Sequence, residues 1–132
     1  MNRWGPGVYD NDAALTLVGA LLDSDDANRL LLETLTAGAA EAADEETTAR
    51  VLAAADLAAS TRGRPSSDLP DDARELVGLF MIYASDDALE QAREAVRGVR
   101  LQRAQAQPEA DSETGARIDL LEARLAELCA RR

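Results

Sequence analysis

The sequence predicts an all-α protein, a compact bundle of five to six helices. Apolar residues make up 46 % of the 132 residues and are mainly alanine and leucine, which lose little side-chain freedom in a helix. They recur at intervals of three and four residues, the period of one helical face. Four segments place short polar residues or a proline beside aspartates, a pattern typical of helix starts. These segments are 10–13, 24–27, 70–73 and 85–88.

Each expected helix is bounded by residues that favour its ends. The second helix is expected to end near Gly38, and Gly63 and Pro65 follow the third, where such residues stop a helix. Pro70 opens the fourth helix at a position where its missing N–H costs nothing. The third helix is rich in alanine, which predicts close approach to a neighbouring helix. The expected helices cover residues 11–22, 24–38, 42–61, 70–84, 85–105 and 116–131.

The expected helix over 70–84 has apolar residues on every face. Leu76, Val77 and Phe80 follow one helical stripe, and the rest of 79–83 covers the other faces. A helix that is apolar all round is a buried helix, so this one is expected at the centre of the bundle. A buried strand over 79–83 is the alternative, but no partner strand is visible elsewhere, which favours the helix.

Three segments are expected: a helical core over 1–106, a linker over 107–115 and a last helix over 116–132. The linker segment is polar, contains Pro108 and lacks periodicity, which predicts flexibility. The last helix repeats apolar residues at 3-4-3 spacing, a narrow seam that packs onto the core or onto a second copy. The sequence therefore allows either a monomer or a homodimer that pairs through this helix. The seam consists of Ile118, Leu121, Leu125 and Leu128.

The net charge of −11 and the computed pI of about 4.3 limit the classes of partner. A negative surface repels nucleic-acid backbones and anionic membranes, so neither is expected to bind. The complementary partner is a basic protein. The longest apolar run is shorter than the roughly 20 residues of a membrane span, and no secretory segment is visible. We expect a cytoplasmic protein.

The missing histidine excludes several chemistries. Histidine is the usual general base at neutral pH and the commonest metal ligand, so Ser-His and Cys-His nucleophile systems and the usual zinc sites are excluded. Cys129 is the only cysteine, which rules out an internal disulfide and fits a reducing cytosol. The sequence therefore predicts no catalytic residue, no metal and no cofactor.

The most informative stretch precedes the first helix and concentrates glycine, proline and aromatic residues over 4–13. It resembles the start of an uncharacterised bacterial family, the domain-of-unknown-function 4259 proteins. The resemblance continues more loosely through 51–59, the loop at 63–65 and the helix after Pro70. It implies a bacterial cytosolic protein and no established activity. The last helix departs from the family pattern, because 118–132 has no tryptophan. The matching residues are Trp4, Gly5, Gly7, Tyr9, Asp10, Asn11 and Asp12.

These seven residues have two interpretations. They form either a structural turn that packs Trp4 and Tyr9 onto the helices, with Asp10 or Asn11 as the helix cap, or a recognition edge for a partner. We take them as the candidate partner-binding residues. The run from Asp10 to Asp12 also resembles the start of a calcium loop, but the later ligands do not follow, so capping explains it better.

The leading functional hypothesis is a non-catalytic protein-interaction module, of which an immunity or antitoxin-like protein is one form. It depends on the small size, the negative charge and the missing conventional catalytic groups. One alternative is an enzyme that uses carboxylates with Mg²⁺, although each of its candidate acids also has a capping role. The other alternative is a structural homodimer subunit paired through the last helix. The candidate acids are Asp12, Asp26, Asp72 and Asp87.

Overall fold

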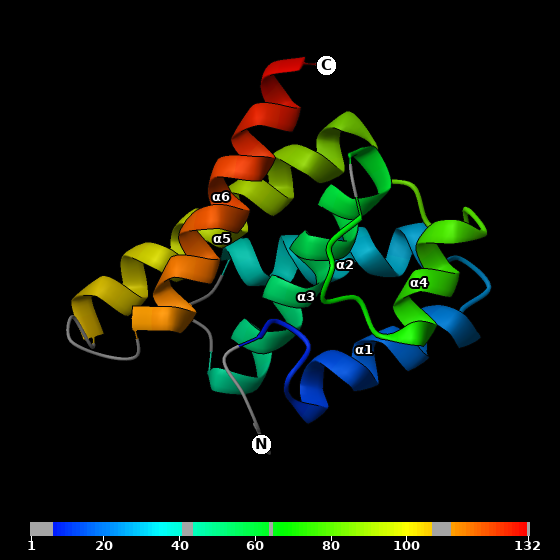
Figure 1. Ribbon diagram of the computed structural model, residues 1–132, viewed down its shortest axis with the longest axis horizontal. Helices are drawn as coiled ribbons and strands as arrows, with labels where there is room; N and C mark the ends of the chain where they lie inside the picture. Colours follow the sequence, from blue (N-terminus) through cyan, green and yellow to red (C-terminus); the bar gives the residue numbers. More distant parts are fainter. Residues whose placement is uncertain (1–6, 41–43, 64, 107–111, 132) are drawn as a thin grey trace.

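The computed structural model describes residues 7–40, 44–63, 65–106 and 112–131 (Figure 1). In these ranges every regular element is an α-helix and no strand occurs, which confirms the predicted all-α bundle. None of the described helices is long and apolar enough to cross a membrane. The helices are α1 Asp12–Asp23, α2 Ala27–Ala40, α3 Glu45–Arg62, α4 Asp71–Gly78, α5 Asp86–Ala106 and α6 Ser112–Arg131.

Side-chain caps begin four of the helices, and three of these caps lie in the recurrent polar starts of the sequence. In each case a side-chain oxygen accepts a hydrogen bond from the backbone N–H three residues later, which satisfies one of the unpaired donors of the first turn. The helix after Pro70 has no such side-chain bond. The capping residues are Asn11 for α1, Asp26 for α2, Asp44 for α3 and Ser85 for α5.

Helix α3 is the central element of the bundle. All residues from 51 to 60 are buried, and α3 contacts α1, α2, α4, α5 and α6 (Figure 1). Five alanines in this stretch leave room for neighbours on every side, so the helices can approach closely. The predicted central position of the 70–84 helix is therefore wrong, and the alanine-rich helix takes that place.

The predicted helix over 70–84 is also too long, because α4 ends at Gly78. The N–H of Phe80 donates to the carbonyl oxygen of Val77, and the N–H of Met81 donates to that of Leu76. These two backward bonds are those of a Schellman motif, which closes the end of a helix. Beyond it the chain has no regular secondary structure, and burial alternates: Ile82 and Ala84 are buried, whereas Tyr83 is exposed.

Helix α6 packs against α5 and α3 of its own chain (Figure 1). Glu122 of α6 pairs with both Arg97 and Arg100 of α5. The helix begins at Ser112, so residues 112–115 of the predicted 107–115 linker are helical, and its 107–111 part lies outside the described residues. Three of the four predicted seam residues are buried, Ile118, Leu121 and Leu125, and Leu128 is partly buried. Cys129 is also buried on α6.

Replacing Leu125 by alanine should lower the free energy of unfolding by about 2–5 kcal/mol, because the side chain is fully buried and leaves a cavity. Leu120→Ala is the matched control on the same helix, since Leu120 is 71 % exposed and should change stability by less than about 0.5 kcal/mol. Urea unfolding of both variants measures the difference. Equal effects would show that α6 does not pack through its Leu125 face.

Candidate functional site

The N-terminal turn, residues 7–11, is held by bonds within itself. The N–H of Gly7 donates to Asp10 Oδ2 at 2.9 Å, and the N–H of Asp10 donates to the carbonyl oxygen of Gly7. A Cβ atom at Gly7 would lie 2.6 Å from Asp10 Oδ2, which is too close for any real contact. A larger residue at this position would therefore have to displace the Asp10 carboxylate, which folds back onto its own turn. Trp4 and Gly5 lie outside the described residues.

Asn11 joins this turn to α1. Its Oδ1 accepts from the N–H of Ala14 at 2.8 Å, and its Nδ2 donates to the carbonyl oxygen of Val8 at 3.2 Å. The side chain is buried, whereas Asp12 beside it is exposed. Of the two predicted caps, Asn11 is the one that forms. Contact of the seven motif residues with a partner stays a prediction.

Tyr9 links the turn to the middle of α3. Its hydroxyl donates to Asp56 Oδ2 at 2.7 Å, and both residues are buried. Burial raises the pKa of Asp56, and outweighs the hydrogen bond from Tyr9 and the positive charge of Arg124, which both lower it. Burial also raises the pKa of Tyr9 well above its ordinary value, with the negative charge of Asp56 as the second cause.

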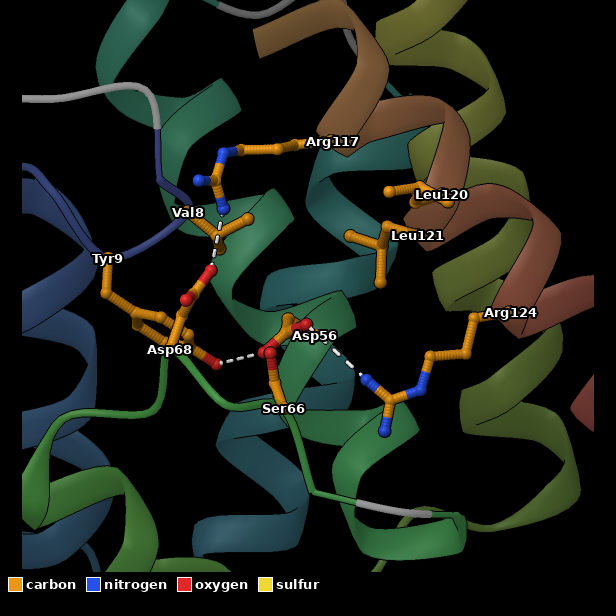
Figure 2. A pocket seen from close by; sticks show the side chains of 9 residues that line it. All are labelled: Val8, Tyr9, Asp56, Ser66, Asp68, Arg117, Leu120, Leu121 and Arg124. Carbon is orange, nitrogen blue, oxygen red and sulfur yellow. Dashed lines mark hydrogen bonds and ion pairs between the residues drawn. The ribbon is translucent and has the colours of Figure 1, made fainter. Parts of the chain in front are cut away.

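A pocket with a volume of about 150 Å³ lies beside this pair. Figure 2 shows Arg117 and Arg124 of α6 pointing toward Asp68 of the α3–α4 connection and Asp56 of α3. Arg124 Nη1 lies 3.8 Å from Asp56 Oδ1, and Arg117 Nη1 lies 2.7 Å from Asp68 Oδ2. Two guanidinium groups thus face two carboxylates, and the four charges sum to zero. We call Tyr9, Asp56 and Arg124 the buried polar cluster. It joins the N-terminal turn, α3 and α6, and its polar groups bind one another.

One feature of the sequence indicates this cluster, and the predictions missed it. Asp56 is a lone acid among alanines and leucines in the most apolar part of α3. A charge at such a position requires partners, because an unpaired buried carboxylate is strongly unfavourable. Which residues supply them follows from the packing, since Arg124 is far away in the sequence.

The four acids considered for a magnesium-dependent enzyme do not include Asp56. They lie at the first turns of four different helices or directly before them, and all are exposed. Within the part of the chain that the structure describes, no group of three or more His, Cys, Asp or Glu side chains is placed to hold a metal ion. The acids are Asp12, Asp26, Asp72 and Asp87.

A second feature lies on the α4–α5 connection at the edge of the molecule (Figure 1). Four large apolar side chains there are exposed, and we call them the apolar connection. Phe80 is the most exposed, at 79 %, and it has a φ of +56°. This left-handed conformation favours glycine at the end of a helix, and bulky residues adopt it rarely. The four residues are Leu79, Phe80, Met81 and Tyr83.

Contacts on the far side hold this connection in place. Ile82 is fully buried, and the N–H of Tyr83 donates to Asn28 Oδ1 at 2.7 Å. Arg62 Nη1 donates to the carbonyl oxygen of Ala84 at 2.9 Å, and its guanidinium carbon lies 5.3 Å from the centre of the Tyr83 ring. The exposed side chains are therefore presented on a backbone that is fixed at both ends.

The fold and these two features define a small helical protein with an internal polar cluster and an exposed apolar surface. The family model named domain of unknown function (DUF4259) matches residues 2–117, and the chain belongs to this family. The match includes Tyr9, Asp56 and the apolar connection, and it ends before Arg124. No curated protein and no solved structure matches the chain.

Tyr9→Phe should lower the free energy of unfolding by about 1–3 kcal/mol, because the buried carboxylate of Asp56 loses its hydrogen-bond donor. Tyr83→Phe is the matched control at the other described tyrosine, which is half exposed, and should change stability by less than about 0.5 kcal/mol. Urea unfolding at neutral pH compares the two. If Tyr9→Phe were as stable as Tyr83→Phe, the hydrogen bond from Tyr9 to Asp56 would contribute nothing to the free energy of unfolding.

The raised pKa of Asp56 predicts a pH dependence with a definite sign. The folded state binds this proton more tightly than the unfolded state, so the contribution of Asp56 to stability is full below the ordinary pKa of 3.8 and is lost as pH rises through the folded pKa. Asp56→Asn cannot titrate and keeps an oxygen that accepts from Tyr9. The stability of the variant relative to the native chain should therefore rise as the pH increases above about 4. Parallel curves across this range would contradict the prediction.

Proposed function

We propose that the chain is a non-catalytic protein-interaction module that binds its partner through the apolar connection, with Phe80 as the anchor. The observation that supports this best is the combination found at Phe80. A large aromatic side chain occupies the left-handed end position of a helix, where glycine is favoured, and is nevertheless 79 % exposed. Both properties cost stability and neither improves the fold of the isolated chain.

Such a cost is typical of a functional position. Left-handed backbone at a residue with a side chain costs about 1–2 kcal/mol, and an exposed ring regains little of this by burial. Aromatic anchors in the centre of an interface, by contrast, supply much of the binding energy. Ile82, Asn28 and Arg62 already hold the connection in place. Binding therefore costs little further conformational entropy of its backbone.

The charge of the chain indicates the chemistry of the partner. Exposed acids flank the apolar connection on both sides in the chain: Glu75 on α4, and Asp86 and Asp87 on α5. With a net charge of −11, the chain attracts a basic surface and repels an acidic one during the approach. The proposed partner is a basic protein with an apolar depression, and a cytoplasmic immunity or antitoxin-like role is one form of this proposal.

Phe80→Gly and Phe80→Asn should separate stability from binding. Both residues tolerate the left-handed conformation, so the free energy of unfolding should stay within about 1 kcal/mol of the native value, or rise. The ring is lost in both variants, so partner binding should be lost. Affinity capture from a bacterial lysate with the native chain and the two variants, followed by mass spectrometry, measures binding.

The control for this experiment is Leu120→Ser, because Leu120 is an exposed apolar residue on α6. The proposal requires one basic protein that is retained by the native chain and by Leu120→Ser, is lost with both Phe80 variants and is released at high salt. Retention of the same proteins by the Phe80 variants would overturn it. So would a salt-resistant acidic partner.

A further inference from the structure

We propose that a hollow next to the apolar connection receives an aliphatic side chain from a basic segment of the partner protein. This inference rests on the proposed function, since it names a second contact on the same face. The hollow has a volume of about 410 Å³, which falls in the range of about 300–1,000 Å³ typical of binding pockets. We call it the Tyr83 hollow. The residues that line it include Asn28, Leu31, Leu32, Tyr83 and Ala88.

The wall of the Tyr83 hollow is mainly apolar and is fixed before binding. Leu31 and Ala88 are buried in the bundle core, whereas Leu32 and Tyr83 remain partly exposed at the surface. The bond from the N–H of Tyr83 to Asn28 Oδ1 spans the gap between α2 and the connection. An aliphatic side chain in this hollow would cover the exposed parts of Leu32 and Tyr83 without any rearrangement of the backbone.

Charge around the rim selects a basic segment. The exposed acids Asp25 and Asp26 precede α2, and Asp86 and Asp87 begin α5. The arginines nearby already pair with acids: Arg29 with Glu33, and Arg62 with Asp86. The rim therefore keeps an excess of negative charge, which complements lysine or arginine beside the inserted side chain.

The same charges argue against a second copy of this chain as the occupant. Another copy would bring a net charge of −11 and an identical acidic rim to the contact. Like charges placed opposite each other across an interface are unfavourable. A basic segment of a different protein gains from both the apolar wall and the rim.

The test uses two short synthetic peptides as probes on the isotopically labelled full chain. One is an amphipathic peptide of lysine and leucine, and the other replaces every lysine by glutamate. The inference expects backbone chemical-shift changes at Asn28, Leu32, Tyr83 and Ala88 with the lysine peptide, and none with the glutamate peptide. Changes elsewhere only, or equal changes with both peptides, would overturn it.

Two variants show whether the hollow itself binds. Leu32→Ser should weaken the lysine peptide by roughly tenfold, because the wall loses an aliphatic group. Leu120→Ser on α6 should leave the affinity unchanged. Unchanged affinity with Leu32→Ser would contradict the inference, as would sedimentation of the free chain as a dimer that dissociates with Leu32→Ser. The Phe80 capture experiment is independent of these results, so the proposed function and this inference can fail separately.

Discussion

Close packing around α3 is the constraint on which the rest of the structure depends. Because five of the ten residues from 51 to 60 are alanine, five other helices can contact α3. The same packing places the carboxylate of Asp56 in the interior, where it needs partners. Tyr9 and Arg124 supply them from opposite ends of the chain. One buried acid thus joins the N-terminal turn and α6 to the central helix.

The N-terminal motif is explained by this arrangement. The Asp10 carboxylate binds the N–H of Gly7, Asn11 caps α1, and Tyr9 reaches Asp56. Gly7, Tyr9, Asp10 and Asn11 thus each have a partner inside the chain. These contacts fix the entry of the chain into α1 and close the buried polar cluster.

The apolar connection differs from the N-terminal turn in what it exposes to solvent. The N-terminal turn hides its polar groups in bonds, whereas the connection exposes Phe80 at a position where glycine would be more stable. Proteins give up stability in this way where binding needs a preformed surface. The buried Ile82 and the hydrogen bond that the N–H of Tyr83 donates to Asn28 Oδ1 hold the backbone of the connection in place, so only its side chains are exposed.

The sequence by itself determined the helical class, three of the helix caps and most of the buried face of α6, because capping and helical periodicity depend on neighbouring residues. Asn11, Asp26 and Ser85 act through contacts three residues away, and the apolar seam of α6 is visible in its spacing. Only the tertiary structure decided which helix is central, where α4 ends and which partners Asp56 has. The run after Gly78 is apolar enough for a buried helix, yet the core already holds α3, so the chain leaves α4 and returns through Ile82. Burial depends on competition among all segments for one interior, and no local pattern contains that information.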